Sequence, residues 1–351
     1  MSWYRARKLF TSKIRRVVRW EFWPMWIFYI PLVICMIPVT LRYRGLTFLA
    51  VNPGFSFSGV VGDKKSLALS QLQEKQAKYI ATFENIPFHM PLNEKIQMAK
   101  FFMSENDYEF PIVLKPNYGQ RGLDVAIVRD EKQMLSYLEQ SKEDVIIQEF
   151  IPGEEFGVFY YRLPNESKGK ILSITEKRFP TLIGDGVSTL ETLILENPRT
   201  HYMAKYLLEL HSQKLSHVLG KGEMFESVEI GAHSRGTLFL DANDMKTEAM
   251  IERFDDLSNS VDGFFFGRYD IRVPSYSEFR AGKQIKVLEL NGVTAEAAHM
   301  YDPKHGVFYA YKTLIKQWEI AYRIGADNIA KGLTPKTGII ALLRHLKLSL
   351  S

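Results

Sequence analysis

The chain has 351 residues and a formal net charge of +5, with 46% hydrophobic and 24% charged residues. This composition is typical of a folded globular protein and excludes an intrinsically disordered or fibrous chain. The length exceeds what a single hydrophobic core usually reaches, so we expect two or three subdomains.

Positive charge is concentrated near the N-terminus, where the basic side chains are Arg5, Arg7, Lys8, Lys13, Arg15, Arg16 and Arg19. A basic arm can bind nucleic acid, but an apolar segment follows this one directly, which favours a membrane surface instead. We therefore expect no nucleic-acid partner. The single cysteine, Cys35, excludes an intrachain disulfide and gives no sign of an oxidising compartment.

Residues 22–39 form an apolar run of 18 residues, about the minimum for a helix that spans a bilayer. Pro24, Pro31 and Pro38 interrupt this run, and each removes a backbone hydrogen-bond donor. We expect a break near Pro31, so that the segment dips into the bilayer and returns, or lies at its interface. The alternative is a buried core helix or the interface of a homodimer.

Beyond the membrane-associating segment, residues 1–45, the chain divides into regions 46–109, 110–330 and 331–351. In region 110–330, runs rich in β-branched and aromatic residues alternate with polar turns, which predicts an antiparallel sheet. Apolar residues that recur every three or four positions predict helices near 131–140, 190–219, 246–258 and 306–324. The predicted fold class is α+β, followed by a short basic amphipathic tail.

The first motif with chemical significance is FPIVLKPNYGQRGLDVAIV, residues 110–128. It predicts two strands joined by a loop that contains Gly119 and Gly122, with Lys115 at the end of the first strand. The backbone N–H groups of such a loop and the lysine charge can hold phosphate groups. Taken alone, the motif also fits an ordinary hairpin with a surface lysine.

A second segment, VIIQEFIPGEEFGV, spans residues 145–158. Adenine needs backbone hydrogen-bonding groups at its edge and apolar surface on its faces, and the stretch Gln148, Glu149, Phe150 and Ile151 can supply both. The carboxylates that follow can accept the hydroxyl protons of a ribose.

The third motif consists of GRYDIRV, residues 267–273, and IKVLELNG, residues 285–292. A hairpin centred between them places Asp270 opposite Glu289 and Arg268 opposite Asn291, all on one face. Two carboxylates and an amide oxygen suit Mg²⁺, and the arginine can stabilise charge on a phosphoryl or acyl group. The alternative is a pair of half-solvated strands with alternating polar residues.

Together these segments resemble, in order and approximate spacing, the ATP-grasp superfamily, and they look like its D-alanine–D-alanine ligase branch over residues 110–302. The resemblance implies an ATP-grasp fold, in which two α+β subdomains clasp ATP. It implies the following roles: Lys115 at the nucleotide phosphates, Glu149 and Ile151 at the adenine, Glu155 at the ribose, Asp270, Glu289 and Asn291 as Mg²⁺ ligands, and Arg268 at the transferring group. The sequence after Asn291 lacks the Pro-Gly of those ligases, so its acceptor pocket need not resemble theirs.

Residues 176–194, EKRFPTLIGDGVSTLETLI, are similar to an element of cyanophycin synthetases and related ligases. This similarity implies that Lys177 and Arg178 face the phosphates or the substrate. The alternative is a tight turn before a helix capped by Ser188. We expect a second phosphate-binding lysine at Lys65 or Lys78.

The resemblance implies a ligase that uses ATP and Mg²⁺ to join a carboxylate substrate to an amine or thiol acceptor through an acyl phosphate. A phosphotransferase on the same fold and a nucleotide-binding membrane scaffold without turnover remain alternatives. The basic arm predicts a cytosolic N-terminus, and ATP is also cytosolic, so we expect the protein at the cytoplasmic face of a membrane.

Overall fold

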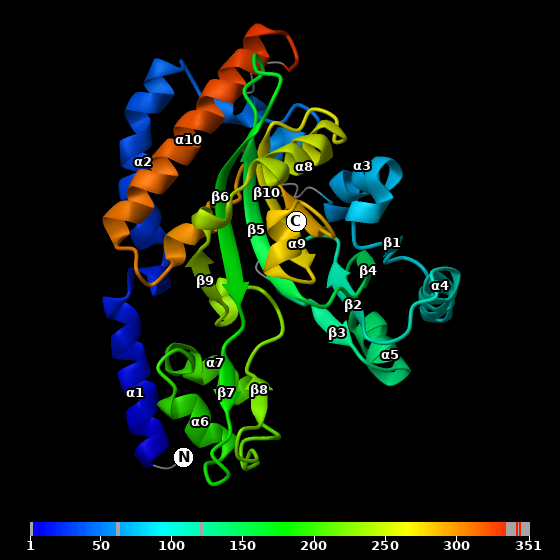
Figure 1. The fold of residues 1–351 in the computed structure, drawn as a ribbon, viewed down its shortest axis with the longest axis vertical. Coiled ribbons are helices and arrows are strands. Elements are labelled where there is room, and N and C mark those ends of the chain that lie inside the picture. The colour runs from blue at the N-terminus through cyan, green and yellow to red at the C-terminus, as the bar shows by residue number, and fades with distance from the viewer. Residues whose placement is uncertain (1–2, 61–63, 120–121, 335–341, 343, 345–351) are drawn as a thin grey trace.

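The computed structural model describes residues 3–60, 64–119, 122–334, 342 and 344. Within them, helices and strands alternate in the α+β arrangement predicted from the sequence (Figure 1). The predicted tail, 331–351, lies mostly outside the described residues. Short 3-10 helices also occur, at η1(Trp20–Phe22), η2(Thr47–Ala50), η3(Ser56–Ser58), η4(Ala77–Tyr79), η5(Thr200–Met203), η6(His233–Arg235), η7(Asn243–Met245) and η8(Ala298–Tyr301).

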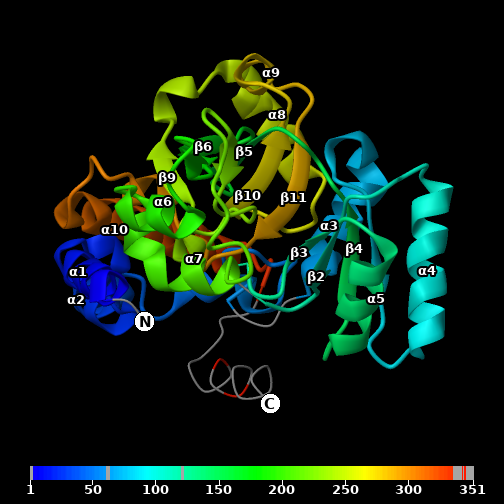
Figure 2. The same ribbon diagram turned by 90° about the horizontal axis from the view of Figure 1, so that it is seen from below.

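A four-stranded antiparallel sheet has the order β1-β4-β2-β3. Its strands are β1(Phe83–Ile86), β2(Ile112–Pro116), β3(Ala126–Val128) and β4(Val145–Glu149). The helices α4(Leu92–Glu105) and α5(Glu131–Gln140) bury their apolar faces against it (Figure 2). The domain boundary that we drew between residues 109 and 110 therefore falls inside the chain segment that forms this sheet.

The second sheet is five-stranded and antiparallel, with the order β11-β10-β5-β6-β9. Its strands are β5(Glu154–Tyr161), β6(Lys170–Arg178), β9(Leu238–Asp241), β10(Phe266–Val273) and β11(Lys286–Asn291). One face packs against α3(Lys65–Gln76), α8(Glu248–Asn259) and α9(Tyr276–Arg280). The short helix α9 lies in the connection of the predicted hairpin, between β10 and β11.

Alternation along β5 and β10 gives the other face of this sheet a mixed character. Phe159 and Phe266 pack beneath α10(Val307–Ala330), whereas Glu155 and Asp270, farther along the same face, are polar. The helix covers the apolar end, and the polar end remains available as the floor of a site. α10 ends six residues beyond the predicted end at 324.

A smaller unit contains β7(Thr181–Ile183), β8(Met224–Glu226), α6(Leu190–Glu196) and α7(Ala204–Leu210). The N-terminal helix α1(Trp3–Val18) packs on it through Tyr4 and Leu9. The two short helices occupy the region 190–219, where one or two were predicted.

The apolar N-terminal segment forms one continuous helix, α2(Met25–Arg42), so the predicted break near Pro31 is wrong. Pro31 and Pro38 lie on its exposed side, where the carbonyl groups that they leave unpaired are not enclosed by protein. The opposite side, which includes Phe28, Leu32 and Met36, packs against α10 (Figure 1).

By length and composition α2 could cross a membrane, with a mean hydropathy of 1.8 and 22% of the segment buried. Core helices of soluble proteins and signal sequences meet the same criterion.

Candidate active site

A cavity of about 1150 Å³ separates the two sheets. Val113 and Lys115 line it from the four-stranded sheet, and Glu155, Lys177 and Asp270 line it from the five-stranded sheet. Thirteen of the predicted site residues contribute to its wall: Lys115, Gly119, Gly122, Gln148, Glu149, Phe150, Ile151, Glu155, Lys177, Arg268, Asp270, Glu289 and Asn291. The structure thus brings together motifs that are up to 176 residues apart, while their catalytic roles remain predictions.

The pairing of β10 with β11 confirms the register predicted from the sequence. Asp270 lies opposite Glu289 and Arg268 lies opposite Asn291, and the register shifts only after Asp270. All four side chains line the cavity.

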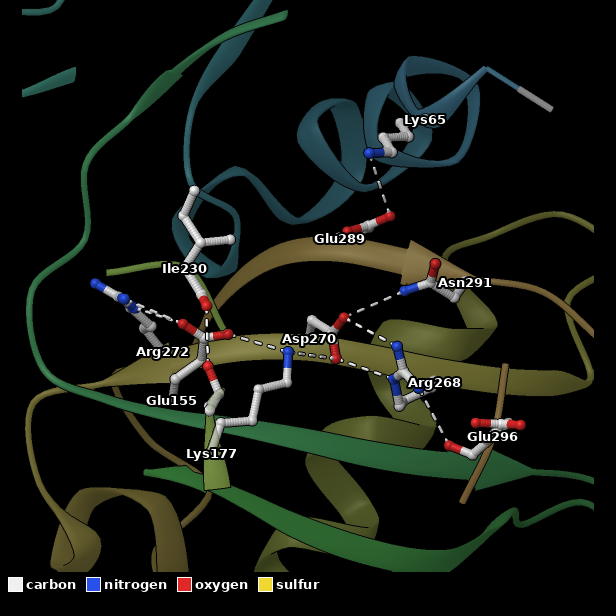
Figure 3. Close-up of polar contacts among 11 residues, drawn as sticks. Lys65, Glu155, Lys177, Ile230, Arg268, Asp270, Arg272, Glu289, Asn291 and Glu296 are labelled. Carbon is white, nitrogen blue, oxygen red and sulfur yellow. Dashed lines mark hydrogen bonds and ion pairs between the residues drawn. The ribbon is translucent and has the colours of Figure 1, made fainter. Parts of the chain in front are cut away.

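Asp270 is the centre of a buried ion-pair network (Figure 3). Its Oδ1 lies 3.0 Å from Arg268 Nε and 3.1 Å from Lys177 Nζ, and its Oδ2 accepts hydrogen bonds from Arg268 and from Asn291 Nδ2. Burial disfavours a charged carboxylate, but the adjacent arginine and lysine outweigh that effect and lower the pKa of Asp270 to about 2. Asp270 is therefore ionised at neutral pH.

Glu155 extends this network on the other side of Lys177. Its carboxylate accepts a hydrogen bond from Lys177 Nζ at 3.0 Å and forms an ion pair with Arg272 at 3.0 Å. A Cβ at Gly231 would lie 2.0 Å from Glu155 Oε1, so a larger residue there would have to displace the paired carboxylate. Both oxygens of Glu155 are already paired, and its role at a ribose stays a prediction.

Lys115 lies beneath the cavity, with 5% of its surface exposed. Its Nζ donates hydrogen bonds to Gln148 Oε1 at 2.7 Å and to the carbonyl of Leu288 at 2.9 Å. Burial lowers the pKa of Lys115 to about 8, and the nearby carboxylate of Glu289 opposes this effect. The lysine is thus mostly charged at neutral pH and close to titrating.

Of the two candidates for a second lysine, the structure places Lys65 at the cavity, 3.6 Å from Glu289 Oε1. Lys78 lies in a separate hollow and stacks on the ring of Tyr79. The position of Lys65 at the first turn of α3 directs it toward the β10–β11 pair.

The segment between β4 and β5 contributes apolar surface and backbone groups. Phe150 and Ile151 line the cavity with Val113, Ile127 and Leu288. The Glu149 carboxylate is already engaged, because it accepts the backbone N–H of Thr82 at 3.1 Å and pairs with Lys286 at 3.3 Å. Its contribution to an adenine site is therefore limited to its backbone.

One expectation from the similarity of residues 176–194 is wrong. Lys177 lies in the cavity, but Arg178 lies on the opposite face of β6, where it pairs with Glu176 at 2.6 Å. Neighbouring residues of a strand point to opposite faces, so only one of the two can reach the site. The helix that follows is capped by Thr189 and not by Ser188, whose hydroxyl donates to Asp185.

Sequence reasoning missed two residues of the site. Arg272 lies two positions beyond Asp270 on the same strand face, a spacing that could have identified it. Glu296 lies in the irregular segment after β11, where no periodicity reveals its direction. Its carbonyl accepts from Arg268 and its Oε2 accepts from Tyr301, and burial raises the pKa of its carboxyl group to about 7.

The donor set fits Mg²⁺ in its chemistry, since Asp270, Glu289 and Asn291 offer hard oxygen ligands from adjacent strands. Within the described residues no group of three or more His, Cys, Asp or Glu side chains could hold a metal, so the amide of Asn291 is needed as the third protein ligand. Arg268 and Lys177 contact Asp270, so a metal ion there competes with existing ion pairs.

Part of the chain matches the model of a known protein family. Residues 68–156, which carry the four-stranded sheet and the start of β5, match the model of the RimK-like ATP-grasp domain. No match to the chain was found among curated proteins.

Solved structures with similarity to the chain include a D-alanine–D-alanine ligase from Bacillus anthracis, with 17% identity over 78% of this chain and 72% of that chain and a TM-score of 0.46. The enzyme from Coxiella burnetii shares 10% identity over 84% and 64% of the two chains, at 0.43. A bifunctional glutathione synthetase from Pasteurella multocida shares 15% identity over 77% and 36%, at 0.35. The family match shows that residues 68–156 resemble an ATP-grasp domain, and the motif residues from the rest of the chain meet this part at the cavity between the two sheets.

Proposed function

We propose that the protein is an ATP- and Mg²⁺-dependent ligase that joins a carboxylate to an amine, with a thiol as the alternative acceptor. The observation that carries this proposal is the pairing of β10 with β11, which gathers Arg268, Asp270, Glu289 and Asn291 on one face of the cavity. A site that only bound nucleotide would not need an arginine next to metal-binding carboxylates.

The nucleotide would lie between the sheets, with its adenine against Phe150 and Ile151 and its phosphates near Lys65, Lys115 and the loop that contains Gly119 and Gly122. Asp270, Glu289 and Asn291 would hold Mg²⁺, which neutralises phosphate charge when bound. Lys177 is within reach of the phosphates only if its contact with Asp270 or Glu155 is exchanged.

In the first step, an oxygen of the substrate carboxylate attacks the γ-phosphorus, and the bond from phosphorus to the bridging oxygen of ADP breaks. The acceptor nitrogen then attacks the carbonyl carbon of the acyl phosphate, and the carbon–oxygen bond to phosphate breaks. Negative charge develops on both transferring groups, and Arg268 lies at the cavity wall where it can stabilise that charge. Positioning the reactants contributes the rest.

The attacking amine must lose a proton, and we assign its uptake to Glu296. This side chain lines the cavity on the side of Arg268 away from Asp270 (Figure 3). With a pKa of about 7, its carboxylate is suited to accept a proton at neutral pH.

We further propose that the protein attaches to the cytoplasmic membrane face through α1 and α2 lying at the interface. The outer side of α2 exposes Trp26, Ile30, Val33 and Ile34, with exposures of 54–66%. The α1 helix adds exposed apolar residues and basic side chains that attract anionic lipid. This arrangement keeps the cavity on the side of the membrane where ATP is present.

The test is an ADP-release screen of the purified full chain with ATP and Mg²⁺ against amino acids, small acids and lipid extracts, followed by mass spectrometry of any product. A ligase releases free phosphate and a condensed product that contains none. Phosphate found on the product would identify a phosphotransferase instead, and a chain that binds ATP without turnover in any mixture would favour a scaffold.

A further inference from the structure

One end of the active-site cavity is built differently from the nucleotide end. It reaches η1, the start of α2, η8 and α10, where its wall consists of Trp20, Phe28, Tyr29, Tyr301, Leu314 and Trp318. We call this part of the cavity the aromatic arm.

The aromatic arm has an ordered wall. Trp20 stacks between Phe28 and Tyr301, with ring centroids 5.3 Å apart in both pairs. The indole N–H of Trp20 donates to the carbonyl of His305 at 3.1 Å, which fixes the ring. A wall of this kind presents apolar surface with little conformational freedom, which suits the binding of an apolar group.

Charged groups stand at the inner end of the aromatic arm. Arg268 donates to the carbonyl of Glu296, and Tyr301, part of the arm wall, donates to the Glu296 carboxylate at 2.8 Å. Glu21 also lines the cavity, where it forms an ion pair with Arg199 at 3.3 Å and a hydrogen bond with the ring of His233 at 3.0 Å. A ligand in the arm therefore meets apolar rings along its length and the reaction centre at its head.

The outer end of the aromatic arm meets the apolar surface of the N-terminal helices. Met25 lines the cavity and is also 50% exposed, so the cavity reaches the surface beside the outer side of α2. In Figure 1, α2 and α10 run side by side along the same flank of the molecule as α1. The volume, about 1150 Å³, exceeds the roughly 300–1,000 Å³ that encloses one drug-sized ligand, so a second substrate can accompany ATP.

We propose that the aromatic arm binds the apolar tail of an amphipathic substrate drawn from the membrane interface, with its carboxylate or amine head group at Arg268 and Glu296. This inference rests on the proposed ligase function and specifies its substrate as a molecule with a long hydrocarbon or aromatic tail. Such a substrate would explain why the basic helix α1 and the apolar helix α2 are joined to an ATP-grasp domain in one chain.

The test uses the full chain and 11-(dansylamino)undecanoic acid, whose fluorescence increases in an apolar site. Saturable binding should be displaced by linear carboxylic acids and alkylamines, with affinity rising about fourfold per added methylene group until the arm is filled. Binding of a fluorescent ATP analogue is measured in the same preparations.

Two neighbouring aromatic residues of α2 provide a matched pair of variants. Tyr29→Asp places a charge in the arm and should weaken probe binding on the order of tenfold. Trp26→Asp places the same charge on the outer side, 66% exposed, and should leave probe affinity within about twofold. If Tyr29→Asp fails to fold, as judged by the ATP analogue, Ala298→Trp serves as a second variant that fills the arm.

Loss of probe binding in Trp26→Asp but not in Tyr29→Asp would place the probe on the outer surface and overturn the inference. Absence of saturable binding while the ATP analogue still binds would overturn it as well and leave the proposed function intact. Failure of the wild-type chain to bind the ATP analogue would reject the proposed function itself.

Discussion

Replacing Asp270 with asparagine should affect both stability and turnover. The carboxylate is buried and contacts Arg268 and Lys177, and its pKa falls from 3.8 to about 2. This difference corresponds to about 2 kcal/mol of folding free energy at neutral pH. Because the folded pKa is depressed, the contribution is present above about pH 4 and is lost as the pH falls toward 2.

We therefore expect Asp270→Asn to unfold at a temperature a few degrees lower than the wild type and to lose ATP turnover. Thermal unfolding and ADP release measure the two effects. The matched control is Asp255→Asn, since Asp255 accepts hydrogen bonds from Tyr160 at 2.6 Å and Gly169 at 2.7 Å outside the cavity. This variant keeps an oxygen that can accept both hydrogen bonds, so it should lose less stability than Asp270→Asn and retain turnover.

The two effects of Asp270→Asn can be separated by a second substitution. In the double variant with Lys177→Met, the lysine left partly unpaired is removed, so the stability loss should be smaller than the sum of the two single losses. Turnover should stay absent. Near wild-type turnover in Asp270→Asn, or unchanged stability, would refute the assignment of this carboxylate as the centre of the site.

Three further predictions concern nucleotide, pH and membrane. Lys115→Ala should weaken ATP binding at least tenfold, as measured by titration. Arg268→Ala should leave the dissociation constant of ATP nearly unchanged and reduce turnover, measured by ADP release, by about 100-fold. Equal losses of ATP binding in the two variants would mean that the roles are misassigned. Because the pKa of Lys115 is about 8, ATP affinity should decline as the pH rises from 7 to 9. A Lys115→Arg variant should lack this decline, since arginine stays charged. An ATP affinity of the wild type that does not change with pH would contradict the assignment of Lys115 to the phosphates. Ile30→Glu with Ile34→Glu should reduce co-sedimentation with anionic vesicles while ATP binding survives, and unchanged sedimentation would remove α1 and α2 from the membrane contact.

The membrane test uses point substitutions because the N-terminal helices are part of the folded core. The α1 helix packs on the unit that contains α6 and α7, and α2 packs on α10. Deleting residues 1–45 would expose both faces and remove part of the cavity wall, so loss of ATP binding in that variant would not be informative.

The pairing of β10 with β11 could be predicted from the sequence, because polar and apolar residues alternate along both strands. The register of β10 with β11 follows from the symmetric spacing of Arg268 and Asp270 with Glu289 and Asn291 about one connection. A short helix in that connection did not disturb the pairing. The family resemblance then supplied the roles that spacing alone could not.

Features that depend on tertiary packing could not be predicted. The strand β1 lies in a region whose periodicity is weak, and it becomes a strand because β4 offers an unpaired edge. The helix α2 continues through Pro31 because α10 supports its other side. Glu296 follows the last strand of the sheet. Its direction is set by hydrogen bonds from Arg268 and Tyr301, which no sequence pattern reveals.

In the proposed reaction, ATP is used to make an acyl phosphate, which an amine then attacks. The most direct measurement is the oxygen isotope content of the phosphate released during turnover in ¹⁸O-labelled water, with any acid and amine mixture that supports ADP release. A ligase should release phosphate without an oxygen from water, because its fourth oxygen comes from the substrate carboxylate. Phosphate that carries ¹⁸O would instead show attack by water, and the claim would be contradicted.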